Sequence, residues 1–302
     1  MARGRYAPSP TGRIHLGNAS TALVSWLSVR ARGGTYVMRI EDLDSPRVVP
    51  GALDALLGDL AWLGLDWDEG PYVQSDRRPV YDAAFETLRR EGHVYPCFCS
   101  RRDIQAAASA PQVPGDEVVY PETCRAVDPA VAAARIARGD AHAFRFRVDG
   151  DPPGFDDRVA GRFDPPPGSI GDFVVRRADG VPAYQLAVVA DDAAMEIDEV
   201  VRARDLLAST SRQLLIYDAL GRVPPSFAHV PLLLGPDGVR LSKRHHGVTL
   251  AELREAGVSA EAIVGRLAHL LGLRKTEAPV EARALADGFD LDALGGVTDR
   301  IV

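Results

Sequence analysis

The sequence predicts an α/β fold in which a parallel sheet is split by an insertion and followed by a small helical domain. Strand-like and helix-like segments alternate from residue 3 to residue 91, a pattern typical of a parallel sheet with crossover helices. Residues 96–170 interrupt this alternation, because they are rich in Pro, Asp and Gly and hold all three cysteines. From Thr249 onward, apolar residues recur at helical spacing.

The first half of the chain contains the clearest elements. Residues 3–8 form a predicted strand that ends at a proline, and a helix begins near Gly17. The pair Gly33-Gly34 ends this helix, since glycine readily adopts the left-handed cap conformation. Residues 35–40 are β-branched and aromatic, which favours a strand. Further helices are predicted at 50–63 and 76–91.

The second half mixes shorter elements. One strand, 143–148, lies within the insertion, and an Asp-Gly turn predicts a hairpin between 173–177 and 183–188. Alternation then resumes with a strand at 199–202, a helix at 209–220 and a strand at 229–234. We therefore divide the chain into the first half of the sheet domain, the insertion, the second half of the sheet domain and the helical domain, at 1–95, 96–172, 173–236 and 237–302.

The overall composition limits the classes of function. Hydrophobic residues make up 46% and charged residues 25% of the chain, as in ordinary soluble globular proteins. The net charge of −7 argues against a general polyanion binder. There is neither an apolar run of about 20 residues nor a signal-peptide core, so we expect a cytoplasmic protein with no membrane partner. A monomer is the default expectation.

The segment after the first strand has the features of a phosphate site. Pro8 to Gly12 precede a helix, whose free N–H groups and dipole favour phosphate. Gly12 and Gly17 let the backbone approach a ligand, and His15 adds a donor. A tight strand-to-helix turn with a surface histidine is the alternative. Lys243 is one of only two lysines among 35 basic residues, and its compact ammonium suits a leaving phosphate.

Two segments carry a resemblance to a known family. Residues 5–12 with 15–18 resemble the first ATP signature of class I aminoacyl-tRNA synthetases, in particular the glutamyl branch. Residues 240–244 resemble the second, lysine-serine-lysine signature, with Arg for the first lysine and Leu for methionine. The resemblance implies a Rossmann-like domain that activates an amino acid as its adenylate, with Mg²⁺ accompanying the ATP phosphates. It implies catalytic roles for His15 and Lys243, and an ATP site of Pro8, Gly12, His15, Gly17, Asn18, Ser242 and Lys243.

The same resemblance implies a glutamate pocket. Its residues match the family's glutamate-binding positions and are Arg5, Ser9, Glu41, Tyr184 and Arg202. Arg5 and Glu41 fall on or after predicted strands, at the carboxyl ends where open α/β sheets bind ligands. Glu41 suits the ammonium, and the two arginines suit carboxylates. The division of labour between the arginines stays open, as does a surface pairing of Arg202 with Asp198 or Glu199.

The cysteines form a Cys97-Phe98-Cys99 pair followed by Tyr120-Pro121-Glu122-Thr123-Cys124. An odd number of thiols makes a disulfide framework unlikely but allows a local metal site, although ordinary buried thiols are an alternative. Structural zinc usually takes four ligands. The resemblance implies a structural zinc held by Cys97, Cys99, Tyr120 and Cys124. His93 or His142 could replace the tyrosine as the fourth ligand.

The acceptor of the activated glutamate is the last expectation. The short tail after Lys243 leaves room for a helical stem-contact region but for no anticodon-binding domain. Residues 202–210 resemble a shorter paralogue within the glutamyl branch, which activates L-glutamate without tRNA and transfers it to the queuosine base at the wobble position of tRNA(Asp). The insertion, with Arg101, Arg102 and Arg125, would then meet the anticodon stem-loop, unless these arginines form a solvated face.

Three other functions also fit this sequence. One is a synthetase that charges a tRNA 3′ end, and another is a small-molecule nucleotidyltransferase. The third is a non-catalytic tRNA-binding paralogue.

Overall fold

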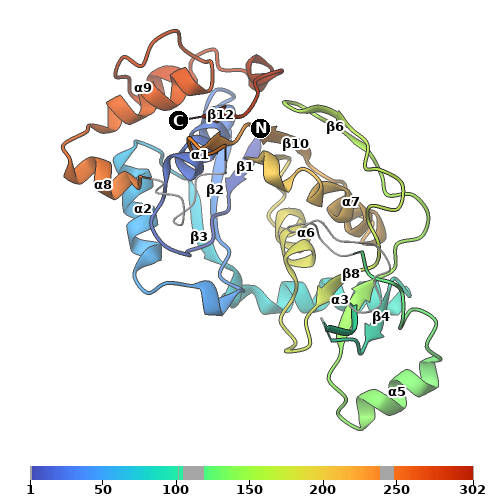
Figure 1. Ribbon diagram of the computed structural model, residues 1–302. Coiled ribbons are helices and arrows are strands. Elements are labelled where there is room, and N and C mark those ends of the chain that lie inside the picture. The colour runs from blue at the N-terminus through green and yellow to red at the C-terminus, as the bar shows by residue number, and fades with distance from the viewer. Residues whose placement is uncertain (1, 101, 105–118, 239–247, 302) are drawn as a thin grey trace.

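The computed structural model describes residues 2–100, 102–104, 119–238 and 248–301. A seven-stranded sheet runs through the molecule in the order β3-β2-β1-β9-β10-β6-β7 (Figure 1). Every pairing in this sheet is parallel except that of β6 with β7. In sheet order the strands are β3 (Glu69–Val73), β2 (Thr35–Ile40), β1 (Arg3–Tyr6), β9 (Glu199–Ala203), β10 (Ser226–Val230), β6 (Phe155–Asp157) and β7 (Gly161–Phe163). The α/β class with a mostly parallel, Rossmann-like sheet is therefore confirmed.

The helix α1 (Leu16–Arg30) is buried along nearly its whole length. It lies between the sheet on one side and the C-terminal helices α9 (Ala260–Leu270) and α10 (Ala282–Ala286) on the other. Gly4 in β1 permits the close approach, because a Cβ there would lie 2.5 Å from Val29 Cγ2. Gly33 follows the helix with φ +60, as its predicted capping role requires.

The other helices largely follow the predictions from the sequence. The predicted helices at 50–63, 76–91 and 209–220 are confirmed, as is the helical character after Thr249. These helices, with the one in the insertion, are α2 (Ala52–Trp62), α3 (Arg78–Arg90), α5 (Pro129–Ala137), α7 (Ser209–Ala219) and α8 (Leu250–Glu255). Short 3-10 turns lie at Ser45–Arg47, Gln74–Arg77, Arg204–Leu206 and Leu291–Leu294. In the described part of the chain, no helix is both long and apolar enough to cross a membrane.

The predicted second hairpin strand at 183–188 is wrong. These residues begin the helix α6 (Tyr184–Ala194), while the first hairpin strand is present as β8 (Phe173–Arg176). The alternation of Tyr, Leu and Val over six residues fits a strand locally. Over a longer window, Leu186, Val189 and Ala190 recur at helical spacing, and all three are buried. α6 packs against both α3 and α7, so it is apolar on most sides and its helical period is weak.

The inserted segment contributes to two different sheets. β4 (Val94–Cys97), β5 (Ala143–Phe146) and β8 form a three-stranded antiparallel sheet. β6 and β7 come from the same stretch of sequence but extend the edge of the main sheet, where Asp157 pairs with Phe227. The segment therefore reaches back to the sheet that it interrupts.

The predicted strand at 229–234 is divided by Pro231. Its first part belongs to β10, and its second part is β11 (Leu233–Leu234), which pairs with β12 (Arg300–Ile301). Proline cannot donate to a ladder, and this explains the break.

Candidate active site and cysteine cluster

A cavity of about 630 Å³ opens at the carboxyl ends of β1, β2 and β9. β1 and β9 are neighbours from opposite halves of the chain, so the cavity lies where the strand order reverses, the usual ligand site of such sheets. Ten of the predicted glutamate- and ATP-binding residues line it, and they are Arg5, Pro8, Ser9, Gly12, His15, Gly17, Asn18, Glu41, Tyr184 and Arg202. Ser242, Lys243 and Arg101 lie outside the described residues.

His15 forms the N-cap of α1. Its Nδ1 accepts hydrogen bonds from the backbone N–H groups of Gly17 at 3.1 Å and Asn18 at 3.4 Å. Because Nδ1 is an acceptor, the ring proton belongs on Nε2. A Cβ at Gly17 would lie 3.1 Å from this ring, so the glycine allows the cap to form. Gly12 has φ +135, a conformation that favours glycine.

Residues that follow the second ATP signature contact the first one. Thr249, which follows residues 240–244, pairs with His15 in an antiparallel bridge. The Leu250 N–H donates to the Ile14 carbonyl at 2.9 Å. On the other flank, Leu233 lines the cavity. Leu233 before the second signature therefore lies at the cavity, and Thr249 after it lies beside the cavity.

Arg202 is buried at the end of β9 and does not form the surface pair considered from the sequence. Its Nε donates to His229 Nε2 at 2.9 Å, and its Nη2 donates to Thr210 Oγ1 at 2.8 Å. Its Nη1 is buried without a hydrogen-bond partner. Glu199 is instead bound to Ser28 and two other arginines. Arg202 thus lines the cavity and carries one guanidinium nitrogen that has no partner.

A buried charge network surrounds the other predicted residues. Arg5 Nε and Nη2 each lie 3.3 Å from an oxygen of Asp192, and Arg39 Nη1 donates to Asp192 at 2.5 Å. Arg39 Nη2 donates to Glu41 at 3.1 Å. Burial raises the pKa of Glu41 against the opposing charges of Arg39 and Arg5. Burial also opposes ionisation of Asp192, but the same two arginines outweigh it and lower its pKa.

The neighbouring residue Asp191 anchors the network to a second group of side chains. It accepts from Arg77 Nε at 2.6 Å, from Gln74 Nε2 at 2.8 Å and from the Tyr81 hydroxyl at 2.8 Å. These partners were not predicted from the sequence, and neither were Arg39, Asp192, Thr210, His229 and Asp157. A usable signal was present, because two aspartates in the apolar stretch 186–194 and an arginine within an apolar strand must find partners.

The three cysteines and Tyr120 form a cluster in the insertion. The three Sγ atoms lie within 4.8 Å of one another, and those of Cys99 and Cys124 are 3.5 Å apart. Tyr120 Oη lies 3.3 Å from Cys97 Sγ and 3.7 Å from Cys99 Sγ, and it accepts from the Cys124 N–H at 2.8 Å. In the described part of the chain, neither His93 nor His142 belongs to this group of potential ligands.

One guanidinium modifies the cluster. Arg145 Nε donates to Cys97 Sγ at 3.3 Å, and its Cζ lies 3.8 Å from the centre of the Tyr120 ring. Burial would raise the pKa of Cys97, but hydrogen bonds from Tyr120, from a backbone N–H and from Arg145 outweigh it and lower that pKa. Burial raises the pKa of Cys99 to about 11. The pKa values of these two thiols are therefore shifted in opposite directions.

The arginines suggested for tRNA contact are placed differently from one another. Arg102 is exposed. Arg125 is held inside the insertion, where Nη1 donates to Asp172 at 2.6 Å and to the Val148 carbonyl at 3.1 Å. Its guanidinium therefore stabilises the insertion.

The chain matches known proteins over nearly its whole length. The family model described as "tRNA synthetases class I (E and Q), catalytic domain" matches residues 1–285. The Glutamyl-Q tRNA(Asp) synthetase of Symbiobacterium thermophilum is 50% identical, over 96% of this chain and 93% of that protein. Glutamate–tRNA ligase 1 of Halorhodospira halophila is 44% identical, over 95% of this chain and 62% of that protein.

The fold is also shared with a solved structure. The glutamate tRNA ligase of Elizabethkingia meningosepticum, crystallised with its amino acid, superimposes with a TM-score of 0.87 at 29% identity. The match covers 100% of this chain and 67% of that one. The chain therefore belongs to the class I tRNA synthetases of the E and Q type, a family of ligases that use ATP.

Proposed function

We propose that the chain activates L-glutamate with ATP, without the help of tRNA, and transfers the glutamate to the queuosine base at the wobble position of tRNA(Asp). One observation carries the first half of this proposal. Arg5, Glu41 and Arg202 line the same cavity as the first ATP signature, which supplies recognition of an acidic amino acid beside a phosphate site. The reacting carboxylate and the α-phosphate are thus brought together by positioning, with no covalent nucleophile from the protein.

In the glutamate half of the site, Glu41 binds the substrate ammonium. Arg202, with its unpartnered Nη1, and Arg5 bind carboxylates. Ser9 and Tyr184 complete the pocket, and both line the cavity. This assignment gives the two carboxylates and one ammonium of glutamate partners of opposite charge.

In the ATP half of the site, His15 donates from Nε2 while its Nδ1 caps the helix. Pro8, Gly12, Gly17 and Asn18 form the backbone cradle around it. Ser242 and Lys243 contact the ATP phosphates, and Lys243 stabilises the charge that develops as pyrophosphate leaves. Mg²⁺ accompanies those phosphates through oxygen ligands. Attack of the glutamate carboxylate on the α-phosphate gives glutamyl-adenylate and pyrophosphate.

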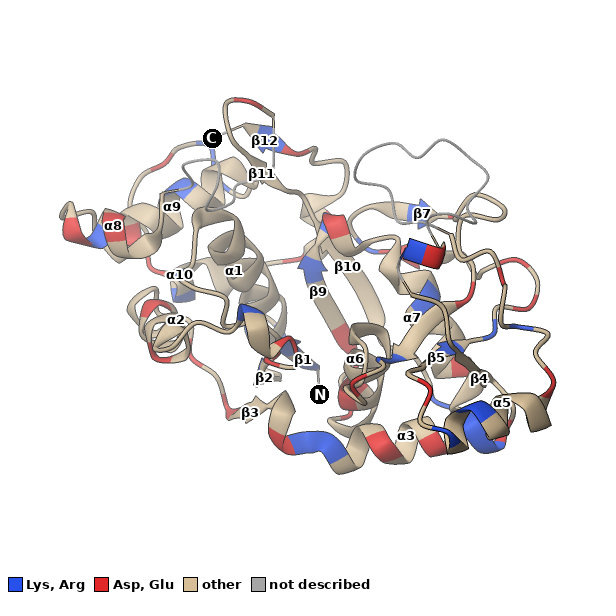
Figure 2. Cartoon of the chain, turned by 60° about the horizontal axis from the view of Figure 1, so that its bottom comes forward, with Lys and Arg blue, Asp and Glu red and all other residues tan. Residues whose placement is uncertain are grey.

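The proposed acceptor rests on the relatives. Proteins named glutamyl-Q tRNA(Asp) synthetase match at higher identity, and over more of their own length, than those named glutamate–tRNA ligase. A hydroxyl of the queuosine base attacks the carbonyl of the adenylate and releases AMP. The insertion at 96–172 faces the anticodon stem-loop, between the sheet halves 1–95 and 173–236, and 237–302 corresponds to the stem-contact region. Figure 2 shows both signs of charge along α3, so we expect phosphate contacts from individual arginines.

We also propose a structural zinc held by Cys97, Cys99, Cys124 and Tyr120. A tetrahedral zinc with S–Zn of about 2.3 Å and O–Zn of about 2.0 Å requires roughly 3.8 Å between sulfurs and 3.5 Å between sulfur and oxygen. The distances of 3.5 Å between Cys99 and Cys124 and of 3.3 and 3.7 Å from Tyr120 Oη fit these values. The metal stabilises the insertion and takes no part in the chemistry.

Transfer of labelled glutamate tests the acceptor. The purified protein is incubated with ATP, labelled glutamate and tRNA(Asp) that either carries or lacks queuosine, and nuclease fragments are then separated. We expect label only with the queuosine-containing tRNA and only in the anticodon fragment. Label on the 3′-terminal fragment would identify a synthetase that charges tRNA ends. Label on neither fragment, with intact adenylate formation, would point to another acceptor. We expect a cytoplasmic protein whose active species is a monomer. Gel filtration of the active fraction measures the size of that species.

A further inference from the structure

A buried histidine and aspartate hold Arg202. His229, on β10, is 0% exposed, and its Nε2 accepts from Arg202 Nε at 2.9 Å. On the other side of the ring, Nδ1 lies 2.6 Å from Asp157 Oδ2. Asp157 ends β6, a strand that the inserted segment adds to the main sheet. Asp157 of the insertion is thus linked to Arg202, which lines the cavity, through the imidazole of His229.

The hydrogen bonds fix the protonation of His229. A guanidinium Nε always donates, so His229 Nε2 must present a lone pair. The ring proton is therefore on Nδ1, and it is donated to Asp157. Burial lowers the pKa of His229, the charges of Arg202 and Arg5 act in the same direction, and Asp157 opposes them. The imidazole is neutral, with a tautomer that Asp157 determines.

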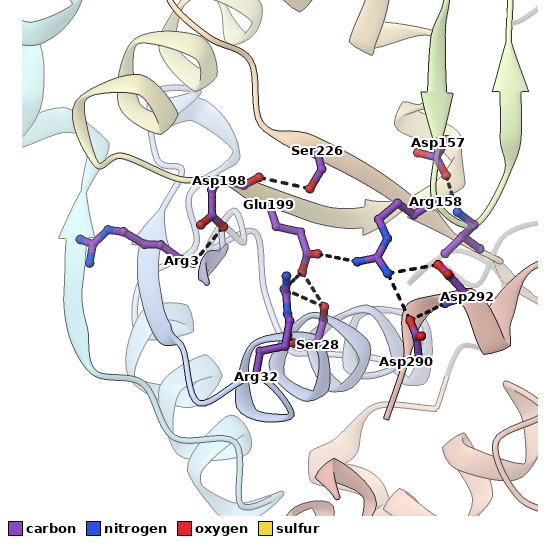
Figure 3. A network of polar contacts seen from close by, with 11 residues as sticks. Arg3, Ser28, Arg32, Asp157, Arg158, Asp198, Glu199, Ser226, Asp290 and Asp292 are labelled. Carbon is purple, nitrogen blue, oxygen red and sulfur yellow. Dashed lines mark hydrogen bonds and ion pairs between the residues drawn. The ribbon is translucent and has the colours of Figure 1, made fainter. Parts of the chain in front are cut away.

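Asp157 itself is held in place on two sides. Its Oδ1 accepts from the backbone N–H groups of Val159 at 3.0 Å, Ala160 at 2.7 Å and His229 at 3.0 Å. The next residue, Arg158, donates to the buried Glu199 and to Asp290 and Asp292, which ties this turn to β9 and to the C-terminal segment (Figure 3). The carboxylate therefore has little freedom to turn away from His229.

Arg202 and Arg5 differ in the charge of their partners. Arg5 faces the carboxylate of Asp192 with two of its nitrogens. Arg202 is held by the neutral acceptors His229 and Thr210, and its Nη1 is left without a partner. Neutral acceptors orient a guanidinium without compensating its charge. Arg202 therefore keeps its charge and one donor for a ligand.

We propose that Asp157 and His229 are positioning residues that hold Arg202 in the orientation that receives a carboxylate of glutamate. This inference rests on the proposed glutamate activation, but not on the identity of the tRNA acceptor. Neither residue touches the substrate. Their effect is transmitted through the orientation of one guanidinium, so it falls on the binding of glutamate and leaves that of ATP unchanged.

Two substitutions of His229 separate positioning from folding. In His229→Asn the amide nitrogen replaces Nδ1 and keeps the bond to Asp157, but the acceptor for Arg202 is lost. In His229→Gln the amide oxygen replaces Nε2 and keeps that acceptor, but Asp157 loses its donor. We expect His229→Asn to raise the KM for glutamate about tenfold or more, the factor for a lost hydrogen bond to a charged group. His229→Gln should have the smaller effect on this KM and the larger effect on thermal stability.

Asp157→Asn tests the tautomer. Its Oδ1 must keep accepting the three backbone N–H groups, so its amide nitrogen faces His229 Nδ1 and moves the ring proton to Nε2, against Arg202. We expect a raised KM for glutamate, with the KM for ATP and kcat at saturating glutamate nearly unchanged. Ser226→Ala, an exposed change on the same strand, is the matched control and should leave every constant unchanged.

The outcomes distinguish the inference from the function on which it rests. Kinetic constants come from glutamate-dependent ATP–pyrophosphate exchange, and stability comes from thermal unfolding. If the unsubstituted protein shows no exchange with glutamate, the proposed function fails. If it exchanges but the KM for glutamate follows stability, with His229→Gln worse than His229→Asn on both, the positioning role is wrong. Unchanged KM values in all three variants would overturn it as well.

Discussion

The cavity and the cysteine cluster both gather ionisable side chains, but they obtain partners for them in different ways. In the cavity, most buried charges are met by residues from distant elements, as with Arg5 and Asp192, which are 187 residues apart. In the cluster, the ligands come from two short neighbouring segments, and Arg145 is the one described cation that contacts a sulfur. The packing of distant elements therefore supplies most partners in the cavity, whereas the cluster gathers three thiols for which we propose a metal as the shared partner.

This difference makes the two regions separable by experiment. A change in the cavity should alter chemistry or glutamate affinity and leave the metal in place. A change in the cluster should alter metal content and stability and leave adenylate formation largely intact.

The largest effect is expected from Lys243→Ala. Loss of a group that stabilises developing charge lowers kcat about 10²–10³-fold, so exchange should fall to near background while zinc content and thermal stability stay unchanged. Lys243→Arg should recover little, because a planar guanidinium replaces a compact ammonium. Lys275→Ala, which removes the chain's other, exposed lysine, is the matched control. Full exchange in Lys243→Ala would contradict the assigned role.

Cys99→Ala tests the opposite side of the comparison. It should abolish zinc binding in elemental analysis and lower the unfolding midpoint by about 5 °C or more, since losing a metal site costs roughly 2 kcal/mol or more and a chain of this size shifts about 2–4 °C per kcal/mol. Exchange without tRNA should remain within a few-fold. The metal proposal fails if the unsubstituted protein contains no zinc and the variant is equally stable.

Tyr120→Phe refines the ligand set. Removing the phenolic oxygen should weaken zinc affinity about tenfold or more, measured by competition with a chromophoric chelator. His142→Ala is the control, because His142 bonds to the Asp140 carbonyl at 2.9 Å and lies outside the cluster. The reverse result, with normal affinity in Tyr120→Phe and lost affinity in His142→Ala, would reassign the fourth ligand.

The smallest effect is expected from pH. Because burial raises the pKa of Glu41, its carboxylate is lost at a higher pH than that of an ordinary glutamate as the solution is acidified. The KM for glutamate should therefore rise several-fold between pH 8 and pH 5, as the partner of the substrate ammonium disappears. The KM for ATP, measured in parallel, should change little. A KM for glutamate that stays constant over this range would argue against Glu41 as that partner.

The sequence predicted the features that are written in contiguous residues. The strand at 35–40 and the helix that follows His15 were predicted because turn residues, caps and apolar spacing are local properties. The cysteines at 97, 99 and 124 left a local metal site open, the family resemblance implied that they share a zinc, and the three sulfurs do lie together.

The partners of the site residues could not be predicted in this way. Asp192 and His229 meet Arg5 and Arg202 only after distant strands and helices have packed, and no local pattern encodes those pairings. The helix α6 was mistaken for a strand for the same reason. It is buried on several sides, so the polar face that normally reveals a helical period is missing.

Activation of glutamate without tRNA is the proposal on which the other assignments depend. Glutamate-dependent ATP–pyrophosphate exchange, measured on the purified protein with and without tRNA, tests it most directly. We predict exchange with glutamate in the complete absence of tRNA, with no large increase when tRNA(Asp) is added. Exchange that appears only with tRNA would contradict this account in favour of a tRNA-dependent synthetase, and no exchange under either condition would indicate a protein that binds tRNA without catalysis.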